Sequence, residues 1–297
     1  MRSRQRVADY APFPLETDAA SLGFGTTRVT REAGSITARH RPHATSARAT
    51  LFLHGAAATW TTWTPLLRLH EFENPVVFDL PGWGDATPSA DAPAITIDTI
   101  CDLVRATAVE LGYTEWDIVG HSMGGFIALH MATLWPGSVR SVRAISPTAD
   151  SVVAAVAHPW AALRIIPGFV LFRAAMIAFA GIDRPARALV GFLARVRVLR
   201  AFVAPLFRHT RRVDPTIVLA LGTELRPRSF VTATEVVRGY DTAAWDAIGC
   251  PIFTTRGDRD VFVTDDDLRG TASVIADCGH FGNVERPAEV LEALGYR

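Results

Sequence analysis

The stretch from Ile118 to Trp135, IVGHSMGGFIALHMATLW, places a serine between glycines where an apolar strand pattern gives way to a helical one. The pattern Gly120-x-Ser122-x-Gly124 in this context is typical of a sharp strand-to-helix turn that displays its serine. Glycines let the strand and the helix pass closely, and the serine oxygen then stands at a helix N-terminus that favours negative charge. We interpret Ser122 as a candidate nucleophile, with an ordinary N-cap serine as the alternative.

A serine hydroxyl is a poor nucleophile unless a base takes its proton, so a histidine is expected nearby. Nine histidines are present, and His280 differs from the others because it lies in CGHFG (278–282), directly after the last predicted strand. That loop opens at the same edge of a parallel sheet as the turn at Ser122. We predict His280 as the base, with a surface-loop histidine as the alternative.

A histidine base needs a carboxylate that orients it and stabilises its protonated form. A predicted strand beginning at Ile252 ends in a turn that carries two acids, Asp258 and Asp260. We predict Asp260 for this role. Asp258 is its rival, and Asp150, in the loop after an earlier strand, is a third candidate.

Short apolar strands alternate with helical patterns along most of the chain, which predicts an α/β fold with a mostly parallel sheet flanked by helices. We assign residues 26–150 and 239–297 to this core and 1–25 to a loose N-terminal leader. The interval 151–238 lacks a clear strand pattern and is rich in alanine, valine, leucine, phenylalanine and arginine. We predict an inserted helical cap there, over the end of the sheet.

The order Ser122, Asp260, His280, each after a strand, resembles the serine-nucleophile branch of the α/β-hydrolase superfamily. The resemblance covers residues 26–150 and 239–297 and is carried by LHG (53–55), DLPGWG (79–84), GHSMGG (120–125), GDRD (257–260), GH (279–280) and ERP (285–287). It implies a sheet of the eight-stranded type, a helical cap between the sixth and seventh core strands, and no metal or organic cofactor. It also implies an acid three residues after Gly257, which supports Asp260.

An oxyanion hole needs two N–H groups that converge on the developing charge. We expect one from Met123, the residue after the nucleophile. By the resemblance, the other comes from the loop after His54-Gly55, and we name Ala56, with Ala57 as the alternative. The alanines 56–58 could instead simply begin a helix.

Large apolar side chains near these loops predict a hydrophobic substrate pocket. We name Trp60, Trp63 and Phe281 as its walls, with ordinary core packing as the alternative for each. Several cap residues should also face the cleft, unless they only pack the cap helices together: Ile165, Ile166, Phe169, Leu171, Phe172, Met176, Ile177 and Phe179.

Composition restricts the partners. The 30 basic and 30 acidic residues balance, and no basic block suggests a nucleic acid. Three widely spaced cysteines form neither a metal motif nor a disulfide framework, which favours a reducing, cytoplasmic location. Residues 161–182 are apolar but interrupted by arginine, proline and glycine, so we expect no membrane span, while peripheral contact through the cap stays open. Nothing in the sequence specifies an oligomeric state.

These features predict a serine hydrolase that cleaves a carboxylic ester, or a similar acyl bond, of a fairly hydrophobic small molecule through an acyl-enzyme. The alternatives are a carbon–carbon bond hydrolase acting on a vinylogous diketone and a lactonase, each with the same three residues. A protein of this fold that binds a ligand without turnover is the alternative of another class. Branches with an aspartate nucleophile, the dehalogenases and epoxide hydrolases, are disfavoured because position 122 is serine.

Overall fold

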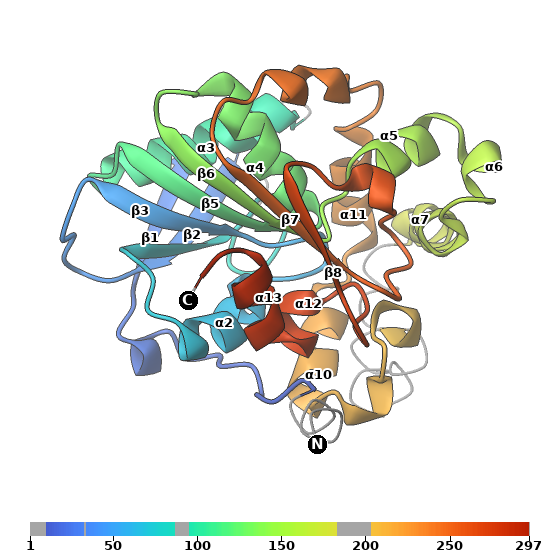
Figure 1. Ribbon diagram of the computed structural model, residues 1–297, viewed down its shortest axis with the longest axis horizontal. Helices are drawn as coiled ribbons and strands as arrows, with labels where there is room; N and C mark the ends of the chain where they lie inside the picture. Colours follow the sequence, from blue (N-terminus) through green and yellow to red (C-terminus); the bar gives the residue numbers. More distant parts are fainter. Residues whose placement is uncertain (1–9, 33, 87–94, 183–202, 297) are drawn as a thin grey trace.

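The computed structural model describes residues 10–32, 34–86, 95–182 and 203–296. At its centre is an eight-stranded sheet in the order β1-β2-β4-β3-β5-β6-β7-β8 (Figure 1). The strands are β1 (Gly25–Arg31), β2 (Gly34–His40), β3 (Arg48–Leu53), β4 (Pro75–Asp79), β5 (Glu115–His121), β6 (Val139–Ile145), β7 (Ile252–Gly257) and β8 (Thr271–Ile275). Strand β2 pairs antiparallel with β1 and β4, and the other pairs are parallel. The predicted fold class is confirmed.

The central strands are apolar on both faces because helices cover both sides of the sheet. Helices α3 (Ile97–Glu110) and α4 (Met123–Leu134) lie on one side, and α2 (Thr64–Leu69), α12 (Gly282–Glu285) and α13 (Pro287–Ala293) on the other (Figure 1). Successive residues of β5 alternate between the two layers: Ile118 packs in the core under α3 and α4, and Val119 packs with α2 and α13. The sheet is therefore packed against a hydrophobic core on each face, and this packing fixes the positions of the carboxyl ends of its strands.

In the described parts of the chain between β6 and β7, helices dominate and lie beyond the carboxyl ends of the strands (Figure 1). They are α5 (Asp150–Ala157), α6 (Pro159–Ala162), α7 (Pro167–Ala180), α10 (Pro215–Glu224) and α11 (Pro227–Glu235). Short 3₁₀ helices are η1 (Ala20–Leu22), η2 (Trp60–Trp63), η3 (Ala204–Leu206), η4 (Thr210–Arg212), η5 (Thr242–Ala247) and η6 (Asp265–Asp267). The division into core and cap stays a prediction, and residues 183–202 of the predicted cap lie outside the described residues.

The N-terminal segment differs from the loose leader that the sequence predicts. Residues 1–9 lie outside the described part, but Tyr10, Leu15 and Phe24 are buried. The Tyr10 hydroxyl donates a 2.6 Å hydrogen bond to Glu285, near the other end of the chain. Sequence periodicity cannot find such a segment, because it forms no helix or strand of its own at this contact.

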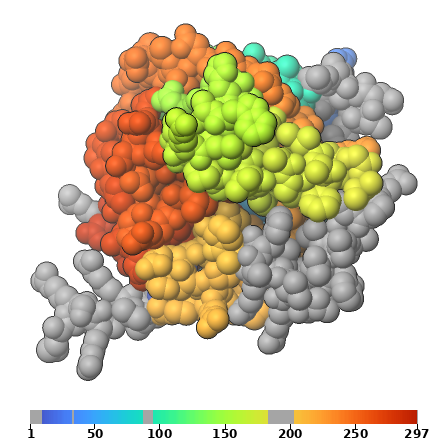
Figure 2. Space-filling view, turned by 90° about the vertical axis from the view of Figure 1, so that its right-hand side faces the viewer, coloured from blue at the N-terminus to red at the C-terminus, as the bar shows by residue number. Residues whose placement is uncertain are grey.

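The large apolar residues of the predicted cap are partly buried and partly exposed. Ile166, Phe169 and Met176 are buried, whereas other large apolar side chains of this stretch are exposed: Trp160, Ile165, Leu171, Ile177, Phe179 and Ile182. Figure 2 shows the α5–α7 segment as a ridge on this face of the molecule. Within the described residues, no helix combines the length and apolarity needed to cross a bilayer.

Candidate active site

Ser122 occupies the tight junction between β5 and α4. Its backbone has φ 51° and ψ −116°, a conformation that costs energy for a residue with a side chain and that recurs at functional sites. A Cβ atom on Gly120 would lie 2.2 Å from the Gly124 carbonyl oxygen, and one on Gly124 would lie 1.8 Å from the Leu53 carbonyl oxygen. Glycine is therefore required at both positions for the strand and helix to cross at Ser122.

His280 and Asp260 form a buried pair at the ends of β8 and β7. The His280 Nδ1 atom lies 2.9 and 3.0 Å from the two Asp260 carboxylate oxygens. The side chains of His280 and Asp260 are 3% and 0% exposed. A ring that donates its Nδ1–H to a carboxylate keeps Nε2 as the acceptor, which is the tautomer a general base needs.

Asp260 is held in its ionised form by its neighbours. Burial alone would raise its pKa, but the His280 imidazole and the backbone N–H of Phe262, which donates a 2.9 Å hydrogen bond, together lower that pKa below its ordinary value. A carboxylate that stays ionised beside the imidazole can stabilise an imidazolium ion.

Asp258 and Asp150, the other two candidates for the orienting acid, interact with groups other than His280. Asp258 accepts a 3.1 Å hydrogen bond from the backbone N–H of Cys278. Asp150 pairs with Arg269 and accepts a hydrogen bond from Thr242. Of the three candidate acids, Asp260 is the one that contacts His280.

His121 is a neighbour of the site whose place the sequence did not reveal. Its Nε2 atom lies 2.9 Å from the His280 carbonyl oxygen, and the two rings are 4.9 Å apart between centroids. Burial, and secondarily the nearby His280, lowers the pKa of His121 to about 3. It is therefore neutral at physiological pH, and its ring packs against the loop that carries His280.

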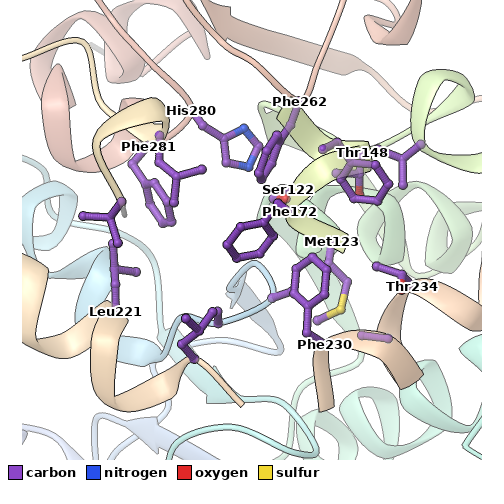
Figure 3. Close-up of a pocket in the computed structure, with 18 of the residues that line it drawn as sticks. Ser122, Met123, Thr148, Phe172, Leu221, Phe230, Thr234, Phe262, His280 and Phe281 are labelled. Carbon is purple, nitrogen blue, oxygen red and sulfur yellow. The ribbon is translucent and has the colours of Figure 1, made fainter. Parts of the chain in front are cut away.

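Ser122, His280 and both residues named for the oxyanion hole line one cavity (Figure 3). Met123 is the first residue of α4, and the first N–H groups of a helix have no partner within the helix. Ala56 follows Gly55, where a Cβ atom would come within 2.9 Å of the Ser122 Cβ. Ala57 also lines the cavity, with φ 58°, so it remains the alternative donor.

The cavity contains about 780 Å³ of non-protein space, including its open mouth. Its polar lining residues are Ser122, Thr148, Thr234 and His280. The other lining residues are apolar: Ala56, Ala57, Met123, Val152, Phe169, Phe172, Val203, Leu206, Leu221, Leu225, Phe230, Ala233, Val237, Phe262 and Phe281. Among the described residues that line it, there is no aspartate, glutamate, lysine or arginine.

Of the three predicted pocket walls, only Phe281 lies in this cavity; Trp60 and Trp63 do not. Helix η2 carries both tryptophans back over the sheet, where they join the core beneath α2 and α13. The Trp63 ring packs 5.3 Å from Phe52, and the Arg39 guanidinium lies 4.8 Å from the Trp60 ring. The prediction failed because proximity in sequence to Ala56 does not fix side-chain direction. Phe172 and Phe230, from the cap interval, occupy the wall instead.

An eight-stranded sheet with a serine displayed after β5 defines the architecture of an α/β hydrolase. A sequence model of the alpha/beta hydrolase family matches residues 50–293, more than half of the chain. The chain therefore belongs to this family.

Curated relatives match only part of this chain. "Epoxide hydrolase 4" of Mus musculus is 30% identical over 97 residues, which are 32% of this chain and 27% of the relative. "2-succinyl-6-hydroxy-2,4-cyclohexadiene-1-carboxylate synthase" of Photorhabdus laumondii is 33% identical over 82 residues, 28% of each. The chain thus matches about a quarter of the length of these relatives.

Solved structures match nearly the whole chain. Cfl2 of Burkholderia cenocepacia superposes with a TM-score of 0.69 at 19% identity, over 95% of this chain and 97% of that one. An alpha/beta hydrolase from a deep-sea metagenome library gives a TM-score of 0.68 at 15% identity, over 91% and 98%. At these identities the likeness shows the fold alone.

Proposed function

We propose that the protein is a serine hydrolase that cleaves uncharged, hydrophobic carboxylic esters through an acyl-enzyme. The observation that carries this proposal is that His280, which forms a buried pair with Asp260, lines the same largely apolar cavity as Ser122. A displayed serine explains the shape of the turn, and the imidazole explains how its hydroxyl is activated.

The proposed reaction uses these groups in order. The Ser122 oxygen attacks the ester carbonyl while His280 Nε2 takes its proton, and the carbonyl electrons move onto oxygen. The N–H groups of Met123 and Ala56 stabilise that oxyanion, and Asp260 stabilises the imidazolium. The tetrahedral intermediate collapses, and His280 protonates the leaving alcohol. Water, deprotonated by His280, then attacks the acyl carbon. The bond to the Ser122 oxygen breaks, His280 returns the proton to that oxygen, and the carboxylic acid is released.

The apolar lining favours a neutral acyl group over one that carries its own charge. An ionised group on the substrate would lose its hydration in the cavity without a partner among the described lining residues, which costs free energy. This argues against a carbon–carbon bond hydrolase with a carboxylate-bearing substrate. The names of the relatives do not decide the chemistry, because the matches cover about a quarter of each.

A substrate panel tests the proposal. Purified protein is given p-nitrophenyl esters of increasing acyl length, the p-nitrophenyl monoester of a dicarboxylic acid, a vinylogous diketone and a lactone. We expect the highest kcat/KM for a neutral apolar ester, and a loss of about a hundredfold for the acid-bearing ester of matched length. Preference for the diketone or the acid-bearing ester would contradict the proposal. Tight binding without turnover would support the non-catalytic alternative.

We further propose that residues 151–238 act as a cap over the core formed by 26–150 and 239–297. The cavity supports this, because Phe172, Leu221 and Phe230 from that interval line it together with Ser122 and His280. We also propose that the enzyme works in the cytoplasm or another reducing compartment, since its three cysteines are free thiols.

A further inference from the structure

A buried carboxylate lies directly behind the loop that carries His280. Glu285 is 0% exposed and points back at the loop that precedes its own helix. Both of its oxygens accept from the Gly279 N–H at 3.0 Å, and Oε1 also accepts from the Phe281 N–H at 3.2 Å. One carboxylate therefore holds the backbone on each side of His280.

The same carboxylate binds two segments that are distant in sequence. Its Oε2 atom accepts a 2.6 Å hydrogen bond from the Tyr10 hydroxyl and a 2.8 Å hydrogen bond from the Arg208 N–H. The Tyr10 oxygen in turn accepts from the His209 N–H at 2.9 Å. The N-terminal segment and residues 208–209, from the middle of the chain between β6 and β7, thus meet at Glu285.

The backbone of His280 itself is fixed from the same side. Its N–H donates a 2.9 Å hydrogen bond to the Leu206 carbonyl oxygen. A Cβ atom on Gly279 would lie 2.6 Å from that Leu206 oxygen and 3.0 Å from a Glu285 oxygen. The contact is close enough that a shift of Glu285 would be transmitted to the loop of the base.

The hydrogen-bond pattern specifies an acceptor at position 285. All of these side-chain contacts come from donors, three backbone N–H groups and one phenol. A glutamine of the same shape would turn an NH₂ group toward at least one pair of these donors, leaving buried N–H groups unpaired. Such a variant keeps the size, but it replaces one acceptor oxygen with an NH₂ donor and removes the negative charge.

We propose that Glu285 is a positioning residue that holds His280 in register with Asp260 and Ser122, and that it couples this alignment to Tyr10 and to the segment 206–209. The proposal rests on the proposed function, because it assigns His280 the role of base. Catalysis is sensitive to displacement, since a shift of about 1 Å in a reacting group can cost roughly a hundredfold in rate. The N-terminal segment then contributes to turnover although none of its described residues, 10–25, lines the cavity.

The test compares Glu285→Gln with Glu289→Gln, a matched loss of a partly exposed carboxylate on the neighbouring helix. For the best neutral ester, we expect Glu285→Gln to lower kcat about tenfold or more with little change in KM. The proton NMR signal of the His280 Nδ1–H, assigned with a His280→Gln variant, should shift or broaden in Glu285→Gln. Glu289→Gln should leave both unchanged. Unchanged kcat and an unchanged signal in folded Glu285→Gln would overturn the proposal.

Tyr10→Phe keeps the proposal testable if Glu285→Gln fails to fold. It removes one donor to Glu285 and the acceptor of the His209 N–H, and we expect a smaller change in kcat and in the NMR signal, in the same direction. Circular dichroism and the melting temperature identify variants that are folded at the assay temperature. If the wild-type protein hydrolyses no ester, the proposed function fails by itself. The Nδ1–H signal then decides on the positioning role, since it needs no turnover.

Discussion

Replacing Asp260 with asparagine tests whether the buried pair performs the chemistry. The substitution keeps the size and a hydrogen-bond acceptor for His280 but removes the negative charge, 2.9–3.0 Å from Nδ1. Two unit charges about 3 Å apart attract by about 5 kcal/mol at an effective dielectric constant near 20. Loss of that attraction to the imidazolium predicts a fall of roughly three to four powers of ten in kcat. KM should change much less, because substrate binding creates no charge on His280.

The assay is steady-state hydrolysis of the best p-nitrophenyl ester, with active enzyme counted by a burst titration. Asp258→Asn is the matched control. Its amide oxygen can still accept the hydrogen bond from the Cys278 N–H, so kcat should stay within about twofold of wild type. A fall in kcat of less than tenfold in folded Asp260→Asn would refute the reasoning. A larger loss of kcat in Asp258→Asn than in Asp260→Asn would indicate that Asp258, and not Asp260, is the acid that supports His280.

Three further results are expected. Gly124→Ala should lower the free energy of unfolding by about 3 kcal/mol or more, because its Cβ would overlap the Leu53 carbonyl oxygen, whereas Gly137→Ala, with open space around it, should unfold like wild type in urea. Phe172→Ala should shift the preferred ester toward longer acyl chains, and an unchanged kcat/KM series would contradict its place in the wall. The lowered pKa of Asp260 means that its ionised form stabilises the fold above the ordinary carboxyl range and that this contribution is lost as the pH falls through the lowered value. Asp260→Asn should therefore flatten the acid dependence of the unfolding free energy, and an unchanged dependence would contradict the assignment.

Sequence patterns predicted the features that depend on interactions between residues close together in the chain. Helical periodicity located α4, and a short apolar run located β5. The glycines around Ser122 indicated the sharp turn, because close crossing of a strand and a helix demands them. The order of Asp260 and His280 after successive strands placed both at one edge, since parallel strands end on the same side of a sheet.

The directions in which side chains point, and the distant segments that they contact, were not predictable from such patterns. Trp60 and Trp63 follow soon after Ala56 in sequence, but a 3₁₀ turn directs both into the core. No sequence pattern around Tyr10 indicates that its hydroxyl bonds to Glu285, which lies 275 residues away. Phe172 faces the cavity while Leu171, its neighbour, is exposed, and a stretch that is apolar all round gives no sign of which side faces inward.

Covalent labelling with a fluorophosphonate tests the central claim most directly. The claim is that Ser122 is a nucleophile activated by His280. The wild-type protein should gain one probe mass per chain, and peptide mapping should locate it on Ser122. Ser122→Ala should gain none, and His280→Ala should react at a small fraction of the wild-type rate. A folded wild-type protein that takes up no probe, or that carries it on another residue, would contradict the account.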